Sequence, residues 1–211
     1  MNLKTRIAAS GTAVVLALTL AACSDDAPEE TGATAAATTS SQTQTSEGTA
    51  DVETAHNAAD TEFAQMMIVH HEGAIEMADL AVEKADSEDV RSLAEGISAA
   101  QGPEIEEMTS WLEAWGEETS PMGGMEGMDH GGMEMEGMSQ EEAMQHLEGL
   151  SGTEFDRSFL EMMIAHHQGA VTMAQTELEE GENPQALELA EKIIADQEAE
   201  ISEMEQMLAA L

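Results

Sequence analysis

Apolar residues recur at three- and four-residue intervals along two stretches of the chain that repeat each other. Residues 60–112 align with residues 156–208 at a constant offset of 96, and 23 of the 53 aligned positions are identical. This spacing is typical of helices with one buried face, and a polar break divides each copy into two helices. The pattern predicts an all-α domain, a four-helix bundle of two repeated helical hairpins at 56–116 and 141–211.

The first 22 residues have the pattern of a signal peptide. Lys4 and Arg6 precede an apolar run that is too short to span a membrane. The run ends at Leu20-Ala-Ala-Cys23, which resembles the site where bacterial lipoproteins are cleaved and acylated. We expect an exported protein that is lipid-anchored through Cys23 to the outer face of the membrane. The alternative is a free cysteine after an ordinary cleavage site.

Two further segments lack the helical pattern. Residues 23–55 are rich in Thr, Ala and Ser, with too little apolar surface to offset the entropy of ordering, which predicts a disordered tether. Residues 117–140 join the repeats and are rich in Met and Gly, which predicts a flexible loop. Its candidate metal ligands are Met122, Met125, Met128, His130, Met133, Met135 and Met138. The alternative for this segment is a low-complexity linker.

The charge of the chain restricts its partners. There are 44 acidic residues against six Lys and Arg, for a formal net charge of -38. Such a surface repels phosphate backbones and anionic lipid heads, so nucleic acid is excluded as a partner and metal ions are favoured. The single cysteine excludes an internal disulfide and a zinc site built from cysteines.

One pair of adjacent histidines lies within the apolar arc of the first helix in each repeat. Methionines stand four residues before each histidine, which stacks thioether and imidazole on one helix face. Thioether is a soft ligand that favours Cu(I), whereas zinc sites use His with Cys or carboxylate. We therefore expect copper, with silver as a chemical mimic. The candidate ligands are His70, His71, His166, His167, Met66, Met67, Met77, Met162, Met163 and Met173.

A carboxylate interrupts the apolar stripe of the second helix in each repeat. Burying Glu104 or Glu200 without a partner costs several kcal/mol, so a histidine of a facing helix or a metal ion is expected to compensate it. Either carboxylate could orient an imidazole or bind the metal directly. The supporting residues considered are Glu104, Glu200, Gln101, Gln197, Met108 and Met204. Core packing is the alternative explanation for the methionines, and a satisfied core position is the alternative for the histidines.

The repeated Met-Met-Ile-x-His-His-x-Gly-Ala-x-x-Met-Ala blocks and the Gln-x-x-Glu-Ile-x-x-Met segments resemble the domain-of-unknown-function 305 family. The resemblance covers residues 60–211 apart from the loop. It implies an exported bacterial protein similar to ferritin-like four-helix bundles, with members associated with copper binding and copper tolerance. Carried across, it supports Met66, His70, His71 and Met77 with Met162, His166, His167 and Met173 as the functional set.

These observations favour an extracytoplasmic copper-binding protein that sequesters or passes on Cu(I) without catalysis, its donor or acceptor protein unidentified. One alternative is a ferritin-like di-metal oxidase, whose sites use Glu from two helices and Glu-x-x-His from two more. Neither repeat carries Glu-x-x-His. The other alternative is a helical interaction module that binds no metal.

Overall fold

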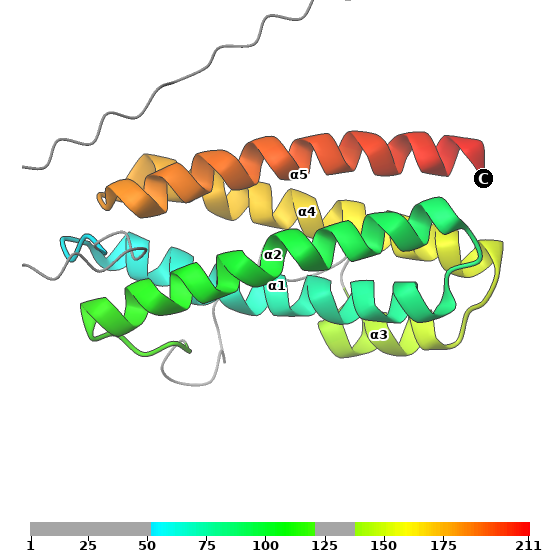
Figure 1. The fold of residues 1–211 in the computed structure, drawn as a ribbon, viewed down its shortest axis with the longest axis horizontal. Helices are drawn as coiled ribbons and strands as arrows, with labels where there is room; N and C mark the ends of the chain where they lie inside the picture. The colour runs from blue at the N-terminus through cyan, green and yellow to red at the C-terminus, as the bar shows by residue number, and fades with distance from the viewer. Residues whose placement is uncertain (1–51, 121–137) are drawn as a thin grey trace, which may run out of the picture. The chain divides into compact units, whose positions relative to one another are not determined.

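The computed structural model describes residues 52–120 and 138–211, all within the compact unit formed by residues 46–211. Five helices are present in this part of the chain (Figure 1): α1 Ala58–Lys84, α2 Glu88–Trp115, α3 Gln140–Glu148, α4 Thr153–Glu180 and α5 Pro184–Ala210. The expected signal peptide, Cys23, nearly all of the expected tether and most of the Met- and Gly-rich segment lie outside the described residues.

The four long helices form two hairpins that pack against each other. Helix α1 packs against α2, α4 packs against α5, and α1 and α4 join the two hairpins, while α2 touches α5 (Figure 1). The described residues form no strand, so the prediction of an all-helical fold is confirmed. None of their helices is long and apolar enough to cross a membrane.

Helix α3 is an element that the sequence analysis does not anticipate. It has nine residues and lies against α1 and α4, with Ala143 and Leu147 buried. Its first turn is closed by a capping box in which Ser139 and Glu142 exchange hydrogen bonds. That Ser-x-x-Glu pattern is visible in the sequence, but nine residues with three apolar positions are too short a stretch to show a helical period.

The ends of the long helices follow from local sequence. Asn57 caps α1 and Asn183 caps α5, each accepting hydrogen bonds from backbone N–H groups of the first turn. Pro184 stands in the first turn of α5, where proline removes no helical hydrogen bond. Gly116 ends α2 with φ 77°, a left-handed conformation that glycine adopts without steric cost. Helix α2 continues through Pro103.

One aspartate in each hairpin accepts hydrogen bonds from the backbone of the turn in the other hairpin. Asp60, in the first turn of α1, accepts backbone hydrogen bonds from Glu182 (3.0 Å) and Asn183 (2.8 Å). Asp156, in the first turn of α4, accepts them from Asp86 (3.0 Å) and Ser87 (2.9 Å). The aspartate and the two turn residues of one set are each 96 positions from their counterparts in the other set. The two hairpins are therefore related by an approximate twofold axis, and α1 and α4 run antiparallel.

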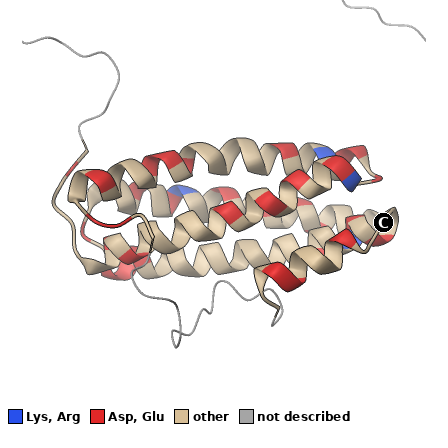
Figure 2. Ribbon diagram, turned by 90° about the horizontal axis from the view of Figure 1, so that it is seen from below, with Lys and Arg blue, Asp and Glu red and all other residues tan. Residues whose placement is uncertain are grey.

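The core is built from alanine, leucine, isoleucine and methionine, with all three phenylalanines and Trp111 buried. Many of the fully buried positions on α1 are alanines, such as Ala74, Ala78 and Ala81. Small side chains at these positions allow adjacent helices to approach closely. Acidic side chains mark all five helices, and the described basic side chains are few (Figure 2).

Candidate metal centre

Four buried histidines lie midway along α1 and α4, where the two hairpins meet. The exposed fraction is 2% for His70, 0% for His71, 4% for His166 and 0% for His167. The rings of His70 and His166 contact each other, with centroids 3.6 Å apart and planes at 41°. Because these two residues are equivalent in the repeat, the approximate twofold axis passes between their rings. The two histidine pairs therefore form one central cluster.

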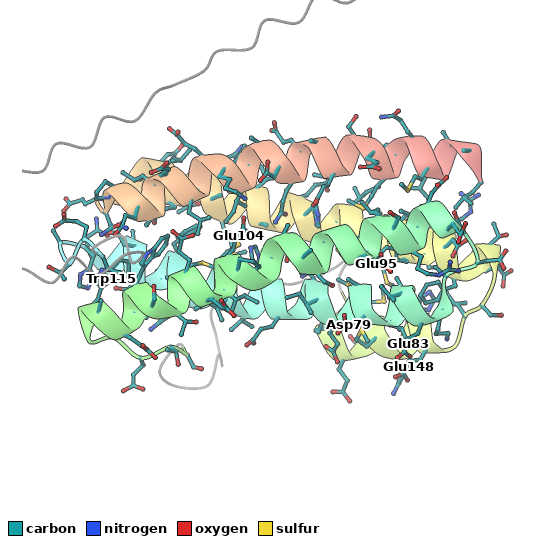
Figure 3. All side chains as sticks on the ribbon, viewed as in Figure 1. Asp79, Glu83, Glu95, Glu104, Trp115 and Glu148 are labelled. Carbon is teal, nitrogen blue, oxygen red and sulfur yellow. The ribbon has the colours of Figure 1, made fainter. Side chains whose placement is uncertain are left out.

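The outer histidine of each pair is held by a carboxylate of the neighbouring helix. Nε2 of His71 lies 2.8 Å from Oε2 of Glu104 on α2, and Nε2 of His167 lies 2.6 Å from Oε2 of Glu200 on α5. Figure 3 labels Glu104 near the middle of α2. Since an ionised carboxylate only accepts hydrogen bonds, Nε2 carries the proton in both cases. A histidine thus supplies the compensation that we expected for each carboxylate.

This arrangement leaves the other ring nitrogen available. Nδ1 of His71, His166 and His167 is buried, and within residues 52–120 and 138–211 it makes no hydrogen bond. A proton on such a nitrogen would lack an acceptor, so the nitrogen carries a lone pair. In His71 and His167 the far nitrogen donates to a carboxylate, which is the usual form of a metal-binding histidine. The donors present fit a metal ion.

Burial keeps the inner histidine uncharged. Desolvation lowers the pKa of His166 well below its ordinary value, and the neighbouring His70, His167 and His71 lower it further because a second positive charge would be repelled. Metal binding by imidazole requires the neutral ring. His166 is therefore in the binding form without having to lose a proton at neutral pH.

The two carboxylates differ in their second partner. Burial raises the pKa of Glu104, but hydrogen bonds from His71 and from Nζ of Lys192 (2.7 Å) outweigh it, and the pKa lies below the usual range. Lys192 also contacts Asp196 at 2.8 Å. Glu200 contacts no lysine or arginine among the described residues. The side chain of Glu104 is 9% exposed and that of Glu200 is 24% exposed.

Most of the candidate methionines are buried. Met67, Met77, Met163, Met108 and Met204 are fully buried, and Met162 is 4% exposed. Met66 and Met173 are partly exposed. Met67 and Met163 stand one helical turn before His71 and His167, so thioether and imidazole share a helix face.

The two supporting glutamines each have a buried side-chain oxygen without a hydrogen-bond partner among the described residues. These atoms are Oε1 of Gln101 and Oε1 of Gln197. Each stands three residues before the carboxylate that holds a histidine. These oxygens add two unsatisfied acceptors to the same part of the core, which is unusual for a native interior.

No three His, Cys, Asp or Glu side chains of the described segments converge in a metal-binding geometry. Of the loop candidates, only Met138 is described, and it packs partly buried against the hydrophobic core. Packing thus explains one methionine for which the sequence offered no packing role; the remaining loop candidates lie outside the described residues.

Sequence reasoning missed Lys192 and a second buried pair, Asp60 and Glu177. The exposed fraction is 0% for Asp60 and 1% for Glu177. Burial and the neighbouring Asp60 raise the pKa of Glu177 to about 8, so it is a neutral acid at pH 7. Backbone N–H groups outweigh the effect of burial on Asp60 and lower its pKa. Glu177 continues the apolar spacing of α4 through Ala170 and Ala174, which is the signal that could have found it.

One Glu-x-x-His sequence, Glu53 to His56, occurs just before α1 and outside both repeats. The His56 ring stacks on Trp115, with centroids 4.5 Å apart and planes at 7°. Its Nε2 lies 3.7 Å from Glu117. His146 is exposed, with Nε2 3.5 Å from Oγ of Ser158. Neither histidine joins the central cluster.

An all-helical protein with repeated, buried His-His pairs is the class that fold and site define. The chain matches the family described as Domain of unknown function (DUF305) over residues 60–208, and it belongs to that family. The resemblance drawn from the repeated blocks is confirmed. No curated protein matches the chain.

Solved structures of the same family are similar in sequence and fold. A DUF305 protein from Streptomyces coelicolor, described as secreted, is 32% identical; the match covers 72% of this chain and 91% of that one, with a TM-score of 0.65. A DUF305 fragment from Deinococcus radiodurans is 34% identical over 74% of this chain and 98% of its own, with a TM-score of 0.63. CopM in its Cu(I)-bound form is 34% identical; the match covers 72% of this chain and 96% of the CopM chain, with a TM-score of 0.59. CopM was also solved with Cu(II) and with silver.

Proposed function

We propose that this protein is an extracytoplasmic copper-binding protein that holds Cu(I) in the core of a ferritin-like four-helix bundle. The observation that carries the proposal is the set of buried Nδ1 atoms on His71, His166 and His167, which lack hydrogen-bond partners in the described structure. Leaving such atoms unsatisfied costs about 1–3 kcal/mol each. A bound cation would remove that cost.

The donor set favours copper over other metals. Imidazole and thioether together match a soft monovalent ion, and most of the candidate thioethers on α1 and α4 are buried, as the histidines are. CopM, which is similar to this chain in sequence and fold, binds Cu(I), Cu(II) and silver. Silver is the expected mimic here for the same chemical reason. The proposed ligands are the four histidines, with sulfur from Met66, Met67, Met77, Met162, Met163 and Met173.

The remaining parts of the chain have supporting roles in this proposal. A lipid on Cys23 would anchor the protein to the outer face of the membrane, and residues 23–55 would tether the helical domain. The Met- and Gly-rich segment would be a second, weaker copper-binding element, since the flexible loop that the sequence predicts would first have to be ordered. The protein would sequester or deliver copper without catalysis. Glu104 and Glu200 already hold histidines, so a carboxylate-rich di-metal site is not favoured.

An anaerobic Cu(I) titration of the full chain against a competing chelator tests the proposal. All samples carry Cys23→Ser, which removes the only thiol. Gln replaces His70, His71, His166 and His167 in one variant, and His56 and His146 in the matched control. A third variant lacks residues 121–137.

We expect the four-histidine variant to lose at least about 100-fold in affinity, since changes even around metal ligands cost 10–100-fold. The control should bind as the parent does. Unchanged affinity in a four-histidine variant whose helical circular dichroism is intact would overturn the proposal. Loss of tight binding only in the variant without the loop would move the site to that segment and contradict the proposal as well.

A further inference from the structure

A groove of about 550 Å³ lies between the first half of α2 and the second half of α5. Its lining includes Asp89, Gly96, Glu200, Glu203, Gln206 and Met207. None of the described residues that line it is basic. Glu200 is the carboxylate that holds His167, so the groove ends one side chain away from the central histidine cluster. We call this feature the Glu200 groove.

The repeat supplies a direct comparison for this groove. Glu200 on α5 corresponds to Glu104 on α2, and Gly96 on α2 corresponds to Lys192 on α5. Beside Glu104 a cation is present, because Nζ of Lys192 lies 2.7 Å from Oε1 of Glu104. Beside Glu200 the position equivalent to Lys192 is Gly96, which carries no charge. A Cβ atom added at Gly96 would meet nothing within 4 Å, so the space is open.

The two carboxylates therefore have the same inner partner and different outer environments. Each accepts a hydrogen bond from a buried histidine through Oε2. The other oxygen of Glu104 is neutralised by an ammonium group of the same chain. The equivalent place at Glu200 is an acidic, solvent-facing groove that also contains the thioether of Met207. Fixed carboxylates in a concave surface concentrate cations.

We propose that the Glu200 groove is a cation-binding site through which copper ions reach His167 and the central cluster. The cation occupies the place beside Glu200 that the ammonium group of Lys192 occupies beside Glu104. Glu203 and Asp89 add negative charge, and Met207 supplies a soft donor for Cu(I). On the other side of the molecule, Lys192 closes the equivalent approach to His71. This inference rests on the proposed copper function, and copper uptake is thereby one-sided.

Transplanting the lysine across the repeat is the test. The full chain with Cys23→Ser is mixed anaerobically with Cu(I) supplied as its cationic acetonitrile complex. Copper that has not been captured is trapped by a chromogenic chelator after set delays. Gly96→Lys places the sister lysine at the groove, and Gly96→Glu adds a side chain of similar bulk and opposite charge. Gly102→Lys is the matched control, because it makes the same replacement elsewhere on α2, where the added Cβ also meets nothing.

We expect Gly96→Lys to slow capture about tenfold relative to Gly102→Lys at low salt, within the range that electrostatic steering spans. Gly96→Glu should capture copper at least as fast as the parent. Equal rates for the two lysine variants, or equal slowing by Gly96→Lys and Gly96→Glu, would overturn the inference. The equilibrium titration is run in parallel: absence of tight binding in the parent chain refutes the copper function itself, whereas tight binding with rates independent of residue 96 refutes only the role of the groove.

Discussion

The two hairpins have the same framework but carry different ionisable side chains at equivalent positions. Both keep the His-His pair and the carboxylate that orients its outer histidine. Both also keep an aspartate, Asp60 or Asp156, that accepts backbone hydrogen bonds from the turn of the other hairpin, and we call these hydrogen bonds the aspartate lock. They differ where Lys192 is matched by Gly96, and where Glu177 is matched by Ala81. The comparison teaches that the groups that hold the helices and orient the imidazoles are present twice, whereas the groups that set access and proton binding are present once.

The second difference extends to the turn of each hairpin. Glu177 is packed over Gly181, where an added Cβ atom would collide with its Oε1. In the other hairpin the corresponding positions are Ala81 and Ala85, both buried. One hairpin thus has a large side chain packed over a glycine, and the other has two alanines at the same positions. The acid pair of Asp60 and Glu177 consequently exists in one half of the domain only.

Among the single substitutions at fixed pH, a change that breaks the aspartate lock should have the largest effect on stability. Asp156→Ala leaves the backbone N–H groups of Asp86 and Ser87 without their acceptor, and we expect a loss of about 3 kcal/mol in the free energy of unfolding. Urea denaturation monitored by circular dichroism measures it. Asp79→Ala, at an exposed position on α1, should change stability by less than about 0.5 kcal/mol. A loss below 1 kcal/mol for Asp156→Ala would show that the lock does not hold the hairpins together.

The acid pair should make stability depend on pH. The pKa of Glu177 is raised by burial and by Asp60 to about 8 from an ordinary value of 4.5. The folded state therefore binds more protons than the unfolded state between these values, and stability falls as pH rises through that window. We expect a loss on the order of 2–4 kcal/mol between pH 5 and pH 9.

Glu177→Gln keeps an N–H donor beside Asp60 and cannot ionise, so it should remove most of this dependence. Glu180→Gln, at an exposed position on the same helix, should retain it. Urea midpoints measured across the pH range compare the three proteins. Identical pH profiles for the parent and the Glu177→Gln variant would mean that the acid pair carries no proton of its own.

The smallest effect is expected from the salt bridge between Lys192 and Glu104. Lys192→Met removes the ammonium group that helps to lower the pKa of Glu104, so the pKa should move upward, as measured by carboxyl carbon NMR. The loss of stability should stay below about 1 kcal/mol, because the Lys192 side chain is 53% exposed and water screens the pair. A pKa that remains depressed in this variant would assign the shift to His71 alone.

The sequence predicted the features that repeat and missed those that occur once. Hydrophobic spacing and the duplicated blocks were enough to predict helices, buried histidines and a carboxylate facing them, because each is a property of one helix face. Lys192 acts through a contact between helices that no spacing within one helix reports. Glu177 continues the apolar spacing of α4, but its neighbour Asp60 lies on another helix, so the acid pair is not visible in that spacing. Helix α3 was missed because only three of its nine positions are apolar. The unsatisfied Gln101 and Gln197 oxygens had no sequence signal.

The most direct test of the central claim is to observe which imidazole nitrogens bind the metal. Nitrogen-15 NMR of the Cys23→Ser chain labelled at histidine, recorded before and after addition of silver(I), reports each ring nitrogen separately. We expect the Nδ1 resonances of His71 and His167 to shift and to show coupling to silver. Their Nε2 atoms should keep their protons and their hydrogen bonds to Glu104 and Glu200. Silver coupling to Nε2 with loss of those hydrogen bonds, or coupling confined to His56, His130 or His146, would contradict a copper site in the helical core.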